Sequence, residues 1–144
     1  MSLAVIDQAL RGMPYVASLG IRVEEARPGH IVLRIPYSRA VTNHAGAIST
    51  GAIFSLGELA GAVAVSTHPL LGPLISLQKS SRIKYYLPAT NDVTAHAGIG
   101  AELVRAVQEG LALGNAHIEV QVKVLDGHGN DVAELLLHFG FKSR

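Results

Sequence analysis

The chain has 144 residues, of which 49% are hydrophobic and 16% are charged, and its formal net charge is +1. This length favours one domain over residues 1–144 with a core of its own. The near-neutral charge, the 5% of aromatic residues and the lack of tryptophan disfavour a surface for nucleic acid. The chain has no cysteine, which excludes disulfides and thiol chemistry. Residues 1–11 lack a secretory-signal pattern, so we expect a cytoplasmic protein.

The first 46 residues predict short elements separated by turns. In chain order we expect a helix over 2–11, a helical turn over 15–19, a strand beginning at 21, a strand over 31–35 and a loop over 36–46. Ser2 is a suitable N-cap for the first helix, and Gly12 and Pro14 end it. The Pro28-Gly29 pair makes a turn between the two strands.

Residues 49–66 predict one long helix that is apolar on nearly every face. A helix of this kind must be enclosed by the rest of the fold. Its small residues would let a sheet approach closely; they are Gly51, Ala52, Gly57, Ala60, Gly61 and Ala64. The helix also contains Ser55 and one acid, Glu58, and these polar residues disfavour a membrane span.

The second half of the chain predicts strands. We expect them over 75–87, 93–102, 117–124 and 133–141, with a hairpin connection at 126–130. Residues 105–114 remain open between a strand extension, a bulge and a long loop. Lys79 and Ser81 share the parity of the apolar residues in their strand, so they would line a site or a subunit interface, unless Lys79 snorkels to solvent. The predicted fold class is α+β, with an antiparallel sheet curled around the 49–66 helix.

This order of elements and the segment over residues 43–61 resemble the hotdog fold, in which a curved sheet wraps one long central helix. Within that fold, the segment is similar to acyl-CoA thioesterases of the phenylacetate-pathway type. Those proteins carry an Asn, then His-Gly-Gly six residues later, then an acid nine residues past the His. Here Asn43 matches the Asn, Ser49-Thr50-Gly51 occupies the His-Gly-Gly positions, and Glu58 matches the acid. The chain resembles an uncharacterised thioesterase-like hotdog branch more closely still. The resemblance lies in the Asn-His start and the Glu-Leu-Ala-Gly ending of the 43–61 segment, and in residues 82–89.

Glu58 is the main candidate for chemistry, because a carboxylate inside an apolar helix is costly to bury without a partner or a function. It would act as general base on water or attack a thioester carbonyl directly, and a structural hydrogen bond is the alternative. Gly51 would polarise the carbonyl through its backbone N–H at the helix start, or simply pack against the sheet. Asn43 would orient water or the carbonyl, or cap a turn.

The remaining candidates would bind substrate. Ser49 would cap the helix or border the substrate, and Thr50 and His44 would line the pocket or be structural. Arg82 and Lys84 lie on the polar parity of their strand, where they would meet the phosphates of coenzyme A or face solvent. The scattered histidines lack metal-ligand spacing and no serine-hydrolase elbow is present, so we expect neither a metal nor a cofactor.

Gly51 and Glu58 are seven residues apart in the sequence, on one side of the helix but about 10 Å apart along its axis. One carbonyl therefore does not reach both groups on the same helix, whereas a second, oppositely running copy would supply the missing group. The resemblance implies such a homodimer, or a dimer of dimers, with sites at the subunit interface. The function we expect is hydrolysis of an acyl thioester of coenzyme A or acyl-carrier protein. The alternatives are a non-catalytic acyl-CoA-binding module and a hotdog hydratase or dehydratase.

Overall fold

The computed structural model describes residues 2–144. Its helices are α1 (Leu3–Arg11), α2 (Pro14–Ser18), α3 (Thr50–Thr67) and α4 (Ala101–Ala112), with a short 3₁₀ turn at Arg39–Val41. Its strands are β1 (Arg22–Arg27), β2 (His30–Ile35), β3 (Ile75–Tyr85), β4 (Val93–Gly98), β5 (Ala116–Asp126) and β6 (Asp131–Lys142). The helices and strands predicted up to residue 66 are confirmed to within a residue or two at their ends.

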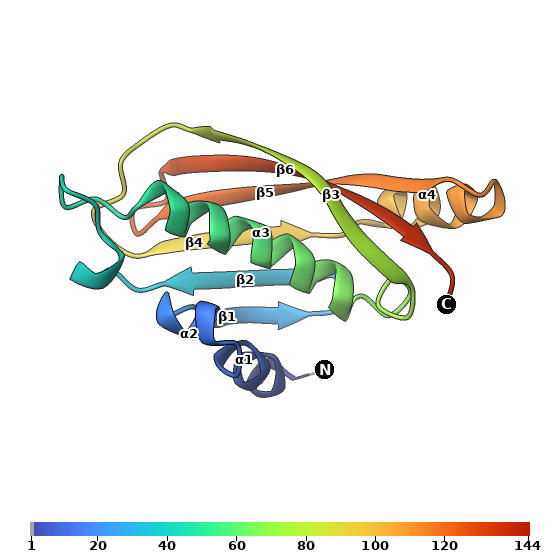
Figure 1. Ribbon diagram of the computed structural model, residues 1–144, viewed down its shortest axis with the longest axis horizontal. Helices are drawn as coiled ribbons and strands as arrows, with labels where there is room; N and C mark the ends of the chain where they lie inside the picture. Colours follow the sequence, from blue (N-terminus) through green and yellow to red (C-terminus); the bar gives the residue numbers. More distant parts are fainter. Residues whose placement is uncertain (1) are drawn as a thin grey trace.

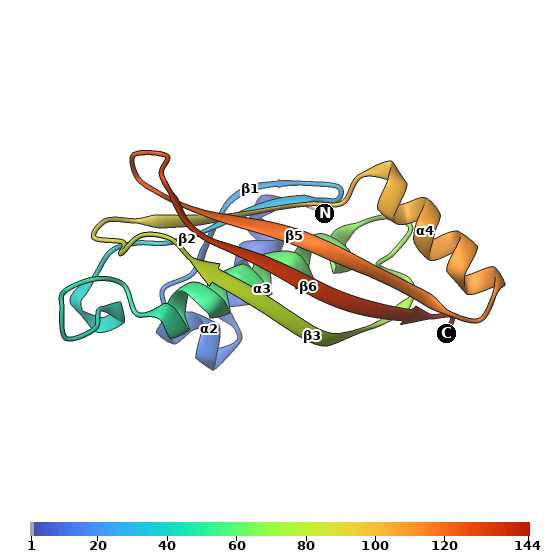
Figure 2. The same cartoon turned by 90° about the horizontal axis from the view of Figure 1, so that it is seen from above.

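All six strands form one antiparallel sheet in the order β1-β2-β4-β5-β6-β3. β1 and β3 are therefore the two edge strands. The sheet curves around α3, which lies along its concave face (Figures 1 and 2). This is the α+β arrangement that the sequence predicts, with one long helix packed inside an antiparallel sheet.

α3 packs closely on the sheet because two of its glycines face β6. A β-carbon on Gly57 would come within 2.5 Å of Leu135 Cδ1, and one on Gly61 would overlap Leu137. Both leucines are completely buried, so these glycines set the distance between helix and sheet. Gly51 differs, because the nearest atom to a β-carbon there would be the Ser49 hydroxyl at 3.7 Å. The prediction that Gly51 also serves close packing is therefore wrong.

The hydrophobicity of α3 is explained by its place in the fold. By length and composition alone this helix could cross a membrane. It is instead the central helix of the domain, and Leu56, Ala60 and Ala64 are completely buried against the sheet. The uncovered stripe of the helix carries half-buried and exposed residues, among them Glu58.

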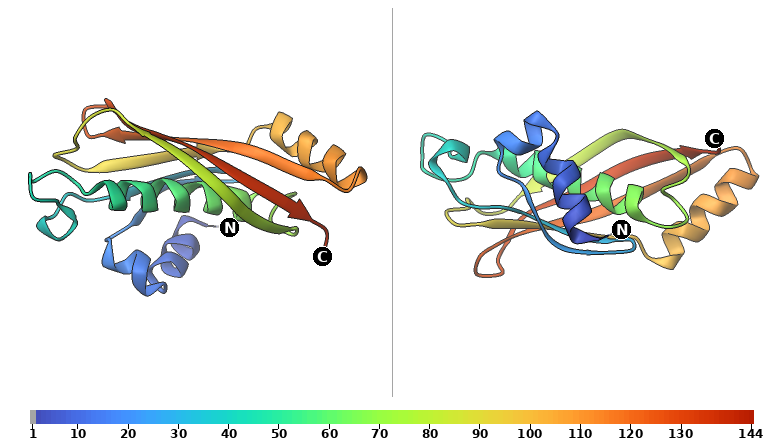
Figure 3. Two further views of the ribbon diagram at one scale, coloured as in Figure 1. Left: turned by 45° about the horizontal axis from the view of Figure 1, so that its top comes forward. Right: turned by 90° about the horizontal axis from the view of Figure 1, so that it is seen from below.

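The helices α1 and α2 lie on the same side of the sheet as α3 (Figure 3). Asp7 of α1 anchors them, since this residue is 4% exposed and its carboxylate accepts the Val23 N–H at 3.0 Å. The guanidinium groups of Arg11 and Arg22 also donate to this carboxylate. The Val23 hydrogen bond, together with the two arginines, lowers the Asp7 pKa to about 2 against the opposing effect of burial.

Residues 101–112 form α4, whereas the sequence predicts a strand to residue 102 followed by a strand extension, a bulge or a long loop over 105–114. β4 ends at Gly98, and α4 buries Val104 and Val107 against the sheet beside β5. Position 110 in this helix requires a glycine, because a β-carbon there would be 2.6 Å from the Asn115 carbonyl oxygen. The prediction of a strand to residue 102 is wrong, and none of the three alternatives for 105–114 holds.

β3 contains a bulge at Lys79 that reverses which side chains face α3. Gln78 before the bulge and Ser81 after it both pair with β6 residues that point to the concave side. The Lys79 side chain lies on the outer face instead, where its Cε would be 2.7 Å from a β-carbon on Gly140. The uninterrupted apolar parity predicted for this strand is therefore wrong, and Lys79 and Ser81 lie on opposite faces.

Candidate active site

Glu58 lies midway along α3 and beside a pocket between α3, α2 and β3. Its side chain is half-buried, and its Oε2 accepts a hydrogen bond from Nε2 of Gln78 at 3.1 Å. The pocket has a volume of about 150 Å³. Its apolar walls come from Val16, Ile21, Leu59 and Ala62. A carboxylate beside an apolar pocket is placed to act on a carbonyl where little bulk water competes.

A second pair of polar groups borders the same pocket. The hydroxyl oxygens of Tyr15 on α2 and Ser55 on α3 are 2.7 Å apart. Ser55 donates its proton to the Gly51 carbonyl at 2.9 Å, so Tyr15 is the donor to Ser55. Ser55 precedes Glu58 by about one helical turn. The Tyr15–Ser55 pair therefore borders the Glu58 pocket where α2 packs on α3.

Local hydrogen bonds organise the start of α3. Ser49 is the N-cap, and its hydroxyl accepts the Gly51 N–H at 3.3 Å. Asn43 Oδ1 accepts the N–H groups of Ala45 and Ala47 at 2.9 and 3.2 Å. Ser49 thus caps the helix and Asn43 closes an Asx-type turn, which are the structural alternatives considered for both residues. Within residues 2–144 the Asn43 amide nitrogen makes no hydrogen bond.

Asn43 and Thr50 line a second pocket, of about 290 Å³, at the N-terminal end of α3. Tyr85 of β3 also lines it, and its hydroxyl donates to the Thr50 carbonyl at 3.3 Å. This pocket shares no lining residue with the Glu58 pocket, and Gly51 lines neither of them. One chain therefore brings Asn43 and Thr50 together but keeps both apart from Glu58.

The positively charged candidates lie on the opposite side of the sheet. Lys79, Arg82 and Lys84 are exposed on the outer face of β3, and Arg82 Nη2 is 3.8 Å from Glu119 Oε1. His44 is exposed in the loop before α3. Within one chain these residues do not gather around Glu58. In the described part of the chain, no group of three His, Asp or Glu side chains is placed to hold a metal ion.

Sequence reasoning missed the three polar neighbours of Glu58 in its pocket, namely Gln78, Ser55 and Tyr15. Ser55 carried a signal, because it is a polar residue three positions before Glu58 in an apolar helix. Gln78 has the same parity as Arg82 and Lys84, which places it on the polar side of a regular strand, and the broken alternation over residues 79–81 is the one sign of the bulge. Tyr15 lies 40 residues from Ser55 in the sequence, and no local pattern predicts that contact.

Solved structures identify the architecture. A Pseudomonas aeruginosa protein of unknown function, described as a probable thioesterase, matches with a TM-score of 0.90 and 25% identity, over 100% of this chain and 97% of that one. A Haemophilus influenzae thioesterase matches with a TM-score of 0.78 and 17% identity, over 98% of this chain and 90% of that one. The protein is a thioesterase-like member of the hotdog superfamily, which confirms the predicted fold.

Residues 4–139 match the family described as a domain of unknown function, DUF4442. A Halobacterium salinarum protein named "Putative esterase" is 32% identical over 123 residues, which cover 81% of this chain and 76% of that protein. The chain belongs to the DUF4442 family.

Proposed function

We propose that this protein hydrolyses an acyl thioester of coenzyme A or acyl-carrier protein, and that Glu58 carries the chemistry. The observation that supports the proposal is the Glu58 carboxylate, which Gln78 holds beside an apolar pocket on the central helix of a thioesterase-like fold. The reaction needs no metal and no cofactor other than its thioester substrate. The single domain over residues 1–144 would act in the cytoplasm.

Two routes are open to Glu58. As a general base, the carboxylate takes a proton from water while the water oxygen attacks the thioester carbonyl. As a nucleophile, the carboxylate oxygen attacks the carbonyl, the thiolate leaves, and water hydrolyses the resulting anhydride. Both routes end with a carboxylic acid and a free thiol, and both develop negative charge on the carbonyl oxygen.

The donor to that oxygen would come from the start of α3 in a second protomer. Gly51 and Glu58 are about 10 Å apart along the helix. Asn43 and Thr50 line a pocket separate from that of Glu58. In a homodimer with antiparallel α3 helices, alone or as a dimer of dimers, the Gly51 N–H and the Asn43 amide of one protomer would reach the Glu58 pocket of its partner. Ser49 and His44, which flank these groups in sequence, would then border the substrate.

The edge strand β3 supports an interface between protomers. Tyr85 at its end, and Tyr86 and Leu87 just beyond it, are about half exposed. An edge strand also presents unpaired backbone groups, which natural proteins commonly cover. Exposed apolar side chains beside such an edge are typical of a surface that another chain buries.

Two alternative functions remain. Non-catalytic acyl-CoA binding is favoured by the internal hydrogen bonds of Asn43 Oδ1 and the Gly51 N–H, since both groups are already engaged within the chain. A hydratase or dehydratase is disfavoured because the described residues that line the Glu58 pocket include no histidine to pair with the acid.

The test is the Glu58→Gln variant, which keeps the shape of the side chain and removes its basicity. We expect kcat to fall by about 10²–10⁴ on the best acyl-CoA, because that is the usual cost of losing a general base. KM should change little where it reflects binding. Circular dichroism and the melting temperature should stay close to wild type.

Glu102→Gln on α4 is the matched control, because it makes the same chemical change on an exposed helix outside the pocket. Glu58→Gln activity within about threefold of wild type would end the catalytic assignment. Wild-type protein that binds acyl-CoA but turns over none of a panel of short, medium, long and aromatic thioesters would favour the binding module.

A further inference from the structure

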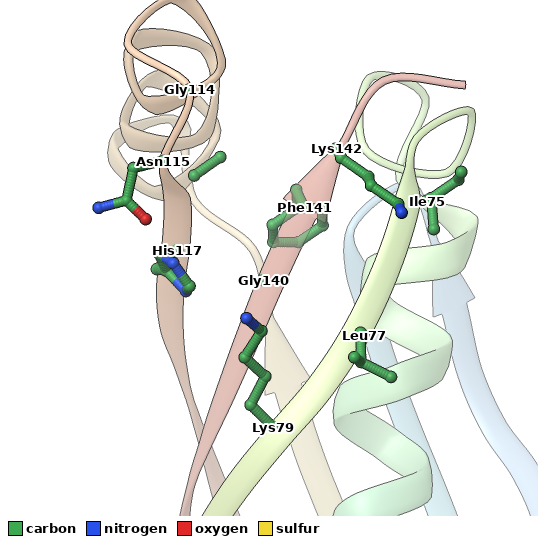
Figure 4. A pocket seen from close by; sticks show the side chains of 10 residues that line it. Ile75, Leu77, Lys79, Gly114, Asn115, His117, Gly140, Phe141 and Lys142 are labelled. Carbon is green, nitrogen blue, oxygen red and sulfur yellow. The ribbon is translucent and has the colours of Figure 1, made fainter.

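The outer face of the sheet has a hollow where one row of side chains is interrupted. Across the three strands β3, β6 and β5, Leu77 pairs with Gly140, and Gly140 pairs with His117. Gly140 has no side chain, so it forms the floor between its two neighbours (Figure 4). The hollow has a volume of about 320 Å³ and lies on the face of the sheet away from α3. It is therefore separate from the Glu58 pocket.

Two lysines border this hollow. The Lys79 side chain runs from the bulge in β3 toward Gly140, and its Nζ would be 3.4 Å from a β-carbon there. Lys142 extends from β6 toward Ile75 at the other end of the hollow (Figure 4). Within residues 2–144 neither lysine has a carboxylate partner within 4 Å. Two unneutralised ammonium groups on one concave surface favour an anionic ligand.

Other polar side chains lie beside the lysines. His117 Nδ1 and His138 Nε2 are 3.0 Å apart, so their hydrogen bond leaves His117 Nε2 for a ligand. Asn115 also lines the hollow and offers a side-chain amide. The nearest acid in strand register is Glu119, opposite His138, and its carboxylate pairs with Arg82. The local charge at the hollow is therefore positive.

We propose that this hollow binds a phosphate group, with Lys79 and Lys142 as the charged contacts and His117 as a further polar contact. The exposed Leu77 would contact the uncharged body of the ligand. The phosphate belongs either to the nucleotide end of coenzyme A, which rests on the proposed function, or to a separate phosphorylated metabolite.

Calorimetric titration tests the proposal on the full-length protein with four probes: coenzyme A, dephospho-coenzyme A, adenosine 3′,5′-bisphosphate and inorganic phosphate. We expect Lys79→Ala and Lys142→Ala each to raise the Kd of the bound probes at least about tenfold, as for the loss of one charge-assisted contact. Gly140→Val should have a similar effect by filling the floor without changing charge. Added salt should weaken binding.

Lys123→Ala is the matched control, because it removes the same charge from an exposed position on the same face. If the variants weaken coenzyme A and the bisphosphate together, the hollow holds the nucleotide of coenzyme A. If they weaken the bisphosphate or inorganic phosphate but leave coenzyme A unchanged, it holds a separate phosphorylated ligand. Equal losses in Lys123→Ala, or no binding of any probe, would overturn the proposal. None of these measurements depends on thioester hydrolysis.

Discussion

Glu58 is positioned by a hydrogen bond that comes from another element, the Nε2 group of Gln78 on β3. Gln78→Leu removes that donor and leaves the carboxylate free to adopt other rotamers. Because misplacing a reacting group lowers the rate more than it lowers binding, we expect kcat to fall about tenfold or more with KM nearly unchanged. Gln121→Leu on the exposed side of β5 makes the same change away from the site and should leave both constants as they are. A fall in kcat that both variants share would show that Gln78 does not position Glu58.

Asp7 is the residue whose titration should matter most for folding. Its pKa of about 2 in the folded protein lies below the value near 3.9 that it takes when unfolded. The contribution of Asp7 to the free energy of unfolding is therefore complete above the unfolded pKa and is lost as pH falls toward 2. The shift corresponds to about 2–3 kcal/mol. Asp7→Asn should lower the free energy of unfolding by about this amount at neutral pH.

Urea titrations at several pH values between 7 and about 2.5 measure this effect. The wild type should lose stability through the acid range, and Asp7→Asn should lose less of it. If the free energy of unfolding fell equally with pH in both proteins, the lowered pKa of Asp7 would be contradicted. Asp131→Asn, at an exposed position at the start of β6, serves as the comparison.

The sequence indicated the catalytic candidate but not its surroundings. Glu58 is recognisable because an acid interrupts an apolar helix, and Ser55 is recognisable for the same reason. The position of Gln78 beside Glu58 depends on a bulge that changes the parity of its strand. The broken alternation over residues 79–81 marks the bulge but does not show which face Gln78 takes. The contact of Tyr15 with Ser55 depends on how α2 lies against α3, and tertiary contacts alone decide that arrangement.

At the scale of elements, the spacing between α3 and the sheet depends on glycines without side chains. Gly61→Ala would place a β-carbon against the buried Leu137, whereas Gly51→Ala meets only the Ser49 hydroxyl at an ordinary distance. Both changes gain similar helix propensity, so their difference isolates the cost of overpacking. We expect Gly61→Ala to be less stable than Gly51→Ala by about 1–3 kcal/mol in urea unfolding. Equal stabilities would mean that the sheet moves away without cost.

The helix α2 forms one wall of the Glu58 pocket and should limit the size of the acyl group. A cavity of about 150 Å³ holds a molecule about the size of benzene. Tyr15→Ala should open the wall and raise kcat/KM for long acyl-CoAs relative to short ones. Tyr15→Phe loses the hydrogen bond to Ser55 but keeps the ring, so its chain-length profile should match the wild type. Identical profiles for all three proteins would exclude α2 as the limiting wall.

The sequence did not predict the helix α4, and the reason is physical. α4 does show apolar residues at helical spacing, at Val104, Val107 and Leu111, but Gly110 interrupts the pattern. That glycine is required by the approach of β5 and not by the helix itself. Long, regular segments such as α3, β5 and β6 were predicted correctly because their own periodicity determines them.

At the scale of the whole molecule, the site that we propose requires two protomers. Sedimentation should therefore give a dimer or a dimer of dimers. Specific activity should fall on dilution through the dissociation constant of the interface, because monomers lack the second α3. The measurement is activity and mass across a dilution series at fixed substrate. A monomer with full specific activity at nanomolar concentration would refute the shared site.

The bulge in β3 also constrains how this family can change in length. Because side chains alternate every two residues along a strand, the one extra residue at Lys79 lets Gln78 and Ser81 face α3 together. Deleting one residue at the bulge would restore regular alternation and keep Gln78 and Ser81 on the side of α3. Deleting one residue elsewhere in β3 would turn part of the strand over. We therefore expect changes of length between relatives to fall at this bulge or in the loops on either side of β3, while substitutions within the strand remain possible.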